Sequence, residues 1–197
     1  QAEDGIRDCL LSRGLGDVYK RQDLNVAVLL MELVDADLAF VAHTANPVTG
    51  DEDEVVGEIC VGLGETLVGN DAGSALAFTV RKSTGDITVR SLPSKLCGHF
   101  APEGGTVIAR SDSNGEDLED FAGAGLYDSI TAAPTESRVV DYAQTPVMWN
   151  ADARDALIHR VAEVASAVAA SRGKPQDIEG AIAGDRLVLL QTRRQIC

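Results

Sequence analysis

One segment of this sequence is long and periodic enough to form a full-length helix. Between Asp152 and Ala170, apolar residues recur on one helical face, namely Leu157, Ile158, Val161, Val164, Ala165 and Val168. Asn150 or Asp152 suits the start of this helix as an N-cap, and Gly173 suits its end. No other apolar run has this length, so the single long helix limits how the rest of the chain can be organised.

The remaining apolar runs are short and are typical of strands separated by turns. They cover residues 26–33, 38–43, 55–61, 75–80, 87–90 and 106–110. Residues 82–86 (KSTGD) join two of these runs into a predicted hairpin. Residues 176–182 and 187–193 form a second, closing hairpin after the long helix.

Composition and charge exclude several classes of protein. The formal net charge is −14, and an acidic surface repels phosphate backbones, which argues against a nucleic-acid partner. No apolar run reaches about 18 residues, so we predict no membrane partner. The four cysteines and three histidines have neither disulfide-framework nor metal-ligand spacing: Cys9, Cys60, Cys97, Cys197, His43, His99 and His159.

Residues 1–22 differ in character from the residues that follow. They resemble a translated sequencing-adapter sequence, and we interpret them as a non-native segment that should be excluded from fold reasoning. A genuine amphipathic N-terminal helix is the alternative. The native part of the sequence then comprises residues 23–197, and we expect it to start inside the domain and not at its first strand.

A glycine-rich segment, Arg110 to Ser129, reads RSDSNGEDLEDFAGAGLYDS. Its arginine ends a predicted strand and can clamp phosphate oxygens with two donors. Its glycines let a backbone approach an anion closely, as at Gly115, Gly123 and Gly125. A surface turn with a salt-bridged arginine remains an equal alternative on glycine content alone.

The closing hairpin carries a second candidate site. Glu179 and Gln191 stand on neighbouring strands, and carboxylate and amide oxygens are ligands that suit Mg²⁺. The polar face of an ordinary antiparallel hairpin is the alternative. Two further segments, HTANPVTG (43–50) and GLGETLVG (62–69), are either functional or ordinary loops that separate the predicted strands.

Together these segments resemble a known family. HTANPVTG, GLGETLVG, RSDSNGEDLEDFAGAGLYDS, QDIEG (176–180) and QTRRQ (191–195) follow one another in the order found in the ATP-binding domain of pyruvate phosphate dikinase, phosphoenolpyruvate synthase and the starch-phosphorylating dikinases. They are most similar to the alpha-glucan water dikinases. The resemblance covers about residues 24–196. Asp120 and Phe121 replace an expected Gly-Tyr, and Arg194 replaces an expected proline.

This resemblance implies an α+β fold, an ATP-grasp-like nucleotide-binding domain that is incomplete at its N-terminal side. It implies a dikinase that phosphorylates alpha-glucan with ATP and water, giving AMP and phosphate. The phosphohistidine of that reaction belongs to a domain absent here, so we expect the fragment to be inactive alone. ATP and alpha-glucan are the implied partners, glucan through absent domains, and the implied location is plastid or cytoplasm.

The resemblance also assigns residues. Arg110 and Arg193 hold phosphates and serve catalysis, while Glu179 and Gln191 hold Mg²⁺. Glu65 and the three glycines named above contact the nucleotide. Two other functions stay open, a fragment of pyruvate phosphate dikinase or phosphoenolpyruvate synthase, and a non-catalytic carbohydrate-interaction module. The scattered aromatic residues argue against the module, which needs exposed rings to stack on sugars.

The metal assignment requires Glu179 and Gln191 to project from the same face of the hairpin, because side chains alternate along a strand. We predict a three-residue loop, 184–186, or a longer loop of the same parity; the three-residue loop pairs Ala183 with Leu187 and sets Glu179 opposite Gln191. In that register Ile178, Ile182, Val188 and Leu190 share the buried face, and the polar face holds Asp177, Glu179, Gln191 and Arg193. Such loops commonly place one residue in the left-handed region, which Asp185 tolerates.

Deleting residues 1–22 is expected to leave the melting temperature unchanged within error, because these residues are predicted not to belong to the native fold. Thermal unfolding of the full and shortened chains measures this directly. A loss of several kcal/mol on deletion would show that the segment packs on the core.

Overall fold

The computed structural model describes residues 26–69, 72–113, 117–118, 121–122 and 129–195. The chain divides into two compact units, which are described separately. The first comprises residues 1–29 and 110–129, and the second comprises residues 30–109 and 130–197. In the described part of the chain, no helix has the length and apolar character needed to cross a membrane.

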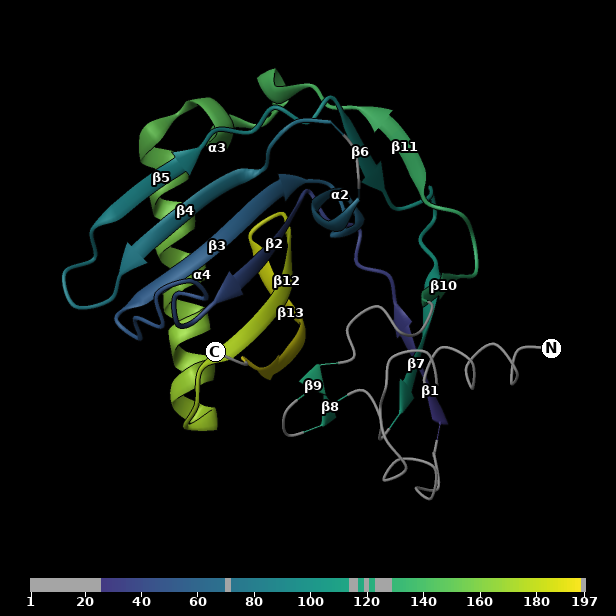
Figure 1. Ribbon diagram of the computed structural model, residues 1–197. Coiled ribbons are helices and arrows are strands. Elements are labelled where there is room, and N and C mark those ends of the chain that lie inside the picture. Colours follow the sequence, from purple (N-terminus) through teal and green to yellow (C-terminus); the bar gives the residue numbers. More distant parts are fainter. Residues whose placement is uncertain (1–25, 70–71, 114–116, 119–120, 123–128, 196–197) are drawn as a thin grey trace. The chain divides into compact units, whose positions relative to one another are not determined.

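A six-stranded antiparallel sheet forms the centre of the second unit (Figure 1). Its strands run in the order β13-β12-β2-β3-β4-β5. Their bounds are Leu38–His43 (β2), Glu54–Val61 (β3), Leu76–Arg81 (β4), Ile87–Ser91 (β5), Gln176–Ala183 (β12) and Arg186–Arg194 (β13). The closing hairpin, β12 and β13, therefore extends the sheet at the edge of β2, the first of these strands in the chain.

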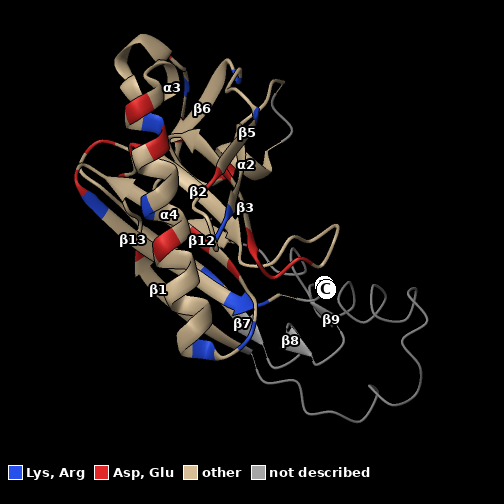
Figure 2. Cartoon of the chain, turned by 90° about the vertical axis from the view of Figure 1, so that its left-hand side faces the viewer, with Lys and Arg blue, Asp and Glu red and all other residues tan. Residues whose placement is uncertain are grey.

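The long helix α4 (Ala151–Arg172) packs along one face of this sheet. Its cap residues are those expected from the sequence. The Asn150 side chain accepts a hydrogen bond from the Ala153 N–H at 3.2 Å, and Gly173 ends the helix with φ of +68°. The side view shows α4 alongside the strands, with acidic and basic positions interspersed along it (Figure 2). Strand alternation decides which sheet residues meet the helix.

The core lies between α4 and the sheet. Leu38, Phe40 and Ala42 alternate along β2 and face the helix, and their cross-strand partners extend this apolar face on both sides. The helix contributes Leu157, Ile158, Val161, Ala162 and Ala165, all buried. The predicted amphipathic face of the helix and the strand pattern of β2 are thus confirmed.

Two glycines make room for aromatic rings in this core. A Cβ atom at Gly57 would lie 2.5 Å from Cζ of Phe78, its cross-strand partner, and 2.9 Å from the carbonyl oxygen of Val41. A Cβ atom at Gly180 would overlap the ring of its own partner, Phe40. Both phenyl rings are fully buried, so these positions tolerate no side chain without repacking.

The closing hairpin differs from the prediction near its turn. Ala183 pairs with Arg186, so the turn has two residues and the predicted three-residue loop is wrong. Gly184 has φ of +57°, and no described residue other than glycine, Asp185 included, has positive φ. Leu187 now faces the core beside Ile182, and Val188 lies on the other face, opposite Ala181.

A β-bulge restores the predicted pairing further along the hairpin. The register shifts between Glu179 and Gly180, so Gly180 pairs with Leu189 and Glu179 pairs with Gln191. The extra residue is Leu190, which packs in a small cluster with Ala181 and Leu63. A bulge places two residues opposite one, and this insertion has the same effect on register as one more residue in the turn.

The smaller elements of the second unit lie around the end of the sheet. They are α2 (Glu65–Val68), β6 (Cys97–Phe100), β11 (Glu136–Val139), η2 (Tyr142–Gln144) and α3 (Pro146–Trp149). Strands β6 and β11 pair antiparallel in a separate two-stranded sheet.

Strands in the rest of the chain form two further sheets. One has the order β1-β7-β10, with bounds Val26–Glu32, Val107–Ser113 and Ser129–Thr131. The other pairs β8 (Asp117–Leu118) with β9 (Phe121–Ala122). With these sheets and few helices the chain has the mixed α+β composition expected from the sequence.

Replacing Gly57 by alanine is expected to destabilise the protein by about 1–3 kcal/mol, because the added methyl group collides with the Phe78 ring and a backbone oxygen. Gly64→Ala is the matched control, since Gly64 has φ of −56° and open space around the added Cβ. Its effect should stay within about 0.5 kcal/mol. Equal melting temperatures for the two variants would contradict the packing argument.

Candidate functional site

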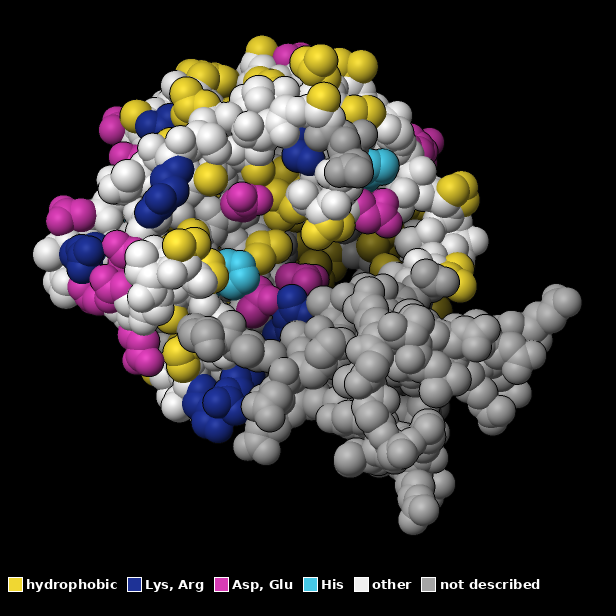
Figure 3. Space-filling model, in the orientation of Figure 1, with side chains coloured by type: hydrophobic (Ala, Val, Ile, Leu, Met, Phe, Trp, Pro, Cys, Tyr) yellow, Lys and Arg dark blue, Asp and Glu magenta, His cyan; other side chains and the backbone are white. Residues whose placement is uncertain are grey.

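The face of the six-stranded sheet opposite α4, here called the open face, carries the polar side chains of the central strands. Cross-strand pairing arranges them in two rows. One row contains Arg193, Asp177 and His43, and the next contains Gln191, Glu179, Val41 and Glu58. Figure 3 shows this face as a hollow with an apolar floor and charged side chains around it.

Asp177 is the centre of the first row. Its Oδ2 atom accepts a hydrogen bond from Nε of Arg193 at 2.8 Å and lies 2.6 Å from Nη2 of the same guanidinium. Its Oδ1 atom lies 3.6 Å from Nδ1 of His43. The carboxylate is buried at 9% exposure, so Arg193 compensates a charge that would otherwise be costly to bury.

Glu179 and Gln191 lie directly opposite one another in the second row. Directly paired residues of antiparallel strands project from the same face, so the predicted shared orientation of these two side chains is confirmed. Both side chains are half-buried. The face that carries them also carries Asp177 and Arg193, which places two carboxylates, one amide and one guanidinium on two adjacent strands.

Hydrogen bonds from the end of β13 and the start of β12 fix the backbone that follows His43. The buried Gln195 side chain accepts from the Ala45 N–H at 3.1 Å and donates to the Ala45 carbonyl at 2.8 Å, as a neighbouring strand would. The Thr44 hydroxyl accepts from the Gln176 N–H at 2.7 Å. The first row is thus attached to a rigid support on both strands.

The loop of the HTANP segment is held by its own polar groups. Asn46 Oδ1 accepts from the Val48 and Thr49 N–H groups, and its Nδ2 donates to Glu54 at 2.6 Å. The Lys82 ammonium donates to the carbonyl oxygens of Thr44 and Glu52 at 2.6 and 2.5 Å. Burial lowers the pKa of Lys82, although three nearby carboxylates oppose this effect.

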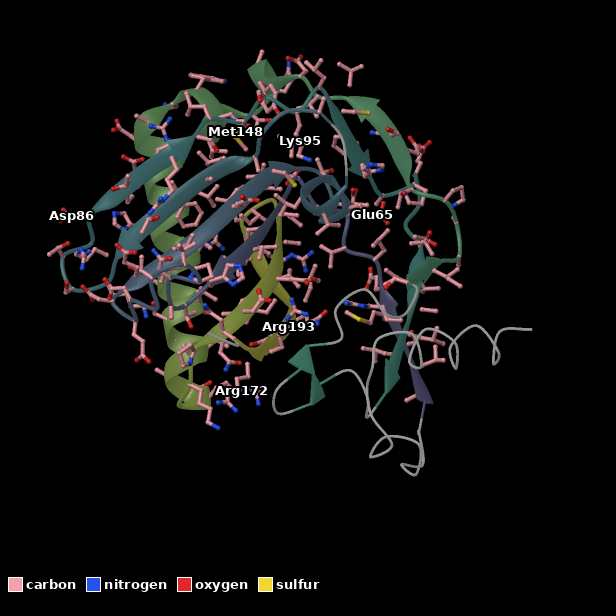
Figure 4. The ribbon with its side chains drawn as sticks, viewed as in Figure 1. Glu65, Asp86, Lys95, Met148, Arg172 and Arg193 are labelled. Atoms are coloured by element: carbon pink, nitrogen blue, oxygen red, sulfur yellow. The ribbon has the colours of Figure 1, made fainter. Side chains whose placement is uncertain are left out.

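The GLGE segment lies at another part of the open face. Glu65 begins α2, where its Oε2 accepts from the Thr135 hydroxyl at 3.1 Å and lies 3.7 Å from Nδ1 of His99. Figure 4 places Glu65 and Lys95 at one end of this face and Arg193 at the other. The buried Lys95 donates to the Gly69 carbonyl at 3.2 Å.

Cys60 lies on β3 between these two ends, and its thiol is unreactive. The thiol is buried at 3% exposure, and burial raises its pKa to about 12. It donates weakly to the Leu63 carbonyl at 3.6 Å. Because the thiolate is the reactive form, Cys60 contributes to packing and not to nucleophilic chemistry at neutral pH.

The glycine-rich segment belongs mainly to the first unit. Arg110 lies in β7, is half-buried and has an interaction partner. Gly115, Gly123 and Gly125 lie outside the described residues. The roles assigned to these four residues therefore stay predictions, and the structure brings together Glu179, Gln191 and Arg193 from the predicted set.

Sequence reasoning assigned no role to two members of the cluster, Asp177 and His43. Asp177 was nevertheless placed correctly on the polar face, because residues two apart on one strand share a face. His43 begins the HTANPVTG segment, but its contact with Asp177 had no sequence signal, because the two residues stand 134 positions apart and meet only through the pairing of β2 with β12.

Oxygen ligands are present in the cluster for a cation. No group of three or more histidine, cysteine or acidic residues gathers as a metal site in the described part of the chain. Mg²⁺ commonly uses only one or two protein carboxylates and completes its coordination with water and phosphate oxygens. The pair of Glu179 and Gln191, with Asp177 beside it, fits that mode of binding.

A cavity of about 730 Å³ lies apart from this cluster, at the end of the sheet near the start of α4. Its lining includes Asp37, Leu157, Arg160 and Phe100, and none of the residues predicted for the site. The concentration of charged side chains in the two rows, and not cavity volume, identifies the candidate site.

Comparisons with known proteins indicate the family to which almost the whole chain is similar. Residues 15–196 match the model of the "Pyruvate phosphate dikinase, AMP/ATP-binding domain" family. The chain is 43% identical over 174 residues to the chloroplastic alpha-glucan water dikinase of Solanum tuberosum, covering 88% of this chain and 12% of that protein. It is 44% identical over 172 residues to alpha-glucan water dikinase 2 of Arabidopsis thaliana, covering 87% of this chain and 13% of that protein.

A more distant relative has a different name. The prodigiosin synthesizing transferase PigC of Serratia marcescens is 28% identical over 128 residues, covering 64% of this chain and 14% of that protein. The chain therefore spans only about an eighth of the length of the relatives it matches.

Gln195→Ala is expected to destabilise the protein by about 1–3 kcal/mol, because it leaves the buried N–H and carbonyl groups of Ala45 without partners. Chemical denaturation measures the change. Gln144→Ala removes the same side chain from an exposed site and should cost no more than about 0.5 kcal/mol. Equal stabilities would show that the Gln195 contacts do not support the site.

Proposed function

We propose, from the premise that this chain belongs to the pyruvate phosphate dikinase AMP/ATP-binding family, that its open face binds the phosphates of ATP together with Mg²⁺. The observation that carries the proposal is the placement of Glu179 opposite Gln191, with the Asp177–Arg193 pair in the adjacent row. These two rows supply anionic and neutral oxygens for a cation and a guanidinium for an anion on one surface.

Arg193 is suited to a phosphate contact although it already pairs with Asp177. A guanidinium has five N–H donors, and the Asp177 contacts use those of Nε and Nη2. The side chain is 26% exposed, so part of it reaches solvent. Asp177 fixes the plane of the guanidinium, which prepares the remaining donors for phosphate oxygens.

Glu179 and Gln191 are the proposed protein ligands of Mg²⁺, with Asp177 as a neighbouring carboxylate. Bound Mg²⁺ neutralises charge on the phosphates during phosphoryl transfer. The chain itself positions the nucleotide: Arg193 orients phosphate, and the backbone pinned by Gln195 and Thr44 keeps the rows in place. Catalysis of this kind is mostly positioning and electrostatic stabilisation.

The whole protein is proposed to be an alpha-glucan water dikinase. It would transfer the β-phosphate of ATP through a phosphohistidine to glucan and the γ-phosphate to water, leaving AMP. The names of the relatives at 41–44% identity support this substrate over those of pyruvate phosphate dikinase or phosphoenolpyruvate synthase. An ATP-grasp-like domain and the nucleotide contacts of Glu65, Arg110, Gly115, Gly123 and Gly125 belong to the same proposal.

A plastid or cytoplasmic location goes with this activity. The relatives from Solanum tuberosum and Citrus reticulata are named chloroplastic, which supports the first of these. Glucan is proposed to bind outside this chain, in the remainder of the full-length protein.

Binding of ATP to the full chain, measured by titration calorimetry with and without Mg²⁺, tests the proposal. Glu179→Gln should weaken Mg²⁺-dependent ATP binding by roughly tenfold or more, because it removes a charged ligand. Glu163→Gln, on the exposed side of α4, makes the same chemical change at the opposite face and should bind as the wild type does. Absence of binding by the wild type, or equal affinities for the two variants, would contradict the proposed function.

A further inference from the structure

Two buried polar atoms on the open face have no hydrogen-bond partner among the residues that the structure describes. They are Nδ1 of His43 and Oδ1 of Asp177, which lie 3.6 Å from each other. The other carboxylate oxygen of Asp177 is bound by Arg193, so the unpaired oxygen is the one directed at the imidazole. Buried polar atoms are nearly always paired, and each exception calls for an explanation.

We propose that His43 is a positioning residue for the phosphate site and acts through Asp177. Its Nδ1–H holds Oδ1 of Asp177, so that Oδ2 faces Arg193 and orients the guanidinium toward phosphate. This inference rests on the proposed function for its effect on the nucleotide. His43 itself contacts neither phosphate nor metal in this scheme.

The arrangement of strands supports a fixed relation between the three side chains. His43, Asp177 and Arg193 are direct cross-strand partners on the adjacent strands β2, β12 and β13. Hydrogen bonds to Thr44 and Ala45, the two residues after His43, prevent the end of β2 from moving. The gap of 3.6 Å exceeds hydrogen-bond length by a few tenths of an ångström, which a small side-chain rotation closes.

The environment of the imidazole selects one tautomer. Nδ1 is buried against a carboxylate oxygen, while the side chain as a whole is 31% exposed. If Nδ1 carried no proton, its lone pair would face the lone pairs of Oδ1, an unfavourable contact in a place that water does not reach. A proton on Nδ1 turns this contact into a charge-assisted hydrogen bond.

The protonation of Nδ1 can be measured without nucleotide. Nitrogen-15 NMR of the histidine-labelled full chain at about pH 8, where an ordinary imidazole is neutral, reports which ring nitrogen carries the proton. His43→Gln assigns the signals. We expect a proton on Nδ1 in the wild type and a shift toward the Nε2–H form in Asp177→Asn. An Nδ1 without a proton in the wild type would overturn the proposal.

Variants test the effect on the phosphate site. His43→Leu should weaken Mg²⁺-dependent ATP binding by about tenfold, the scale of losses seen when a group that orients a ligand is removed. His43→Asn should retain most of the affinity, because its amide nitrogen can occupy the place of Nδ1. His159→Leu, on α4 at the other face of the sheet, should have wild-type affinity.

A double-mutant cycle separates positioning from a general structural role. If His43 acts through Asp177, His43→Leu should have little further effect on affinity in an Asp177→Asn background. Additive losses, or an equal loss in His43→Asn and His43→Leu at unchanged melting temperature, would overturn the proposal. A wild-type chain that binds no ATP would refute the proposed function, and the NMR result would then decide the His43–Asp177 contact on its own.

Discussion

The packing of α4 against one face of the six-stranded sheet determines where the polar side chains of the central strands can lie. Side chains alternate along each strand, so a residue beside a core residue must point to the open face. Ala42, Ile178 and Ile59 are buried core residues under α4. Their neighbours His43, Asp177, Glu179 and Glu58 therefore gather on the opposite surface. The apolar packing of one side of the sheet against α4 thus determines which charged side chains lie on the open face.

That charged surface combines groups of opposite sign in a protein that is strongly acidic overall. The net charge of −14 would repel a nucleotide at long range. Groups on the open face could offset this repulsion at short range. Arg193 is held there by Asp177, and the carboxylate and amide oxygens could bind a cation. The proposed recognition of phosphate on this face would depend on a few fixed groups and not on the average surface potential.

The sequence predicted the long helix, the strands of the sheet and the shared face of Glu179 and Gln191. These features follow from periodicity and residue type, which are local properties. The two-residue turn with its bulge at Leu190 could not be predicted, because it depends on Leu190 packing with Ala181 and Leu63 in three dimensions. The approach of His43 to Asp177 could not be predicted for a similar reason, since it depends on which strand lies beside β2.

The position of β12 between β2 and β13 has a consequence for the order of folding. Strands β2 to β5 are consecutive in the chain and can pair as soon as they are made, but β2 keeps an open edge until the closing hairpin arrives. The bonds between Ala45 and Gln195 join residues 150 positions apart. Closing such a long loop is slow, and an unpaired strand edge meanwhile favours association with other chains. Because His43 and Asp177 meet only at this step, the proposed phosphate site is expected to be among the last parts of the domain to form during synthesis.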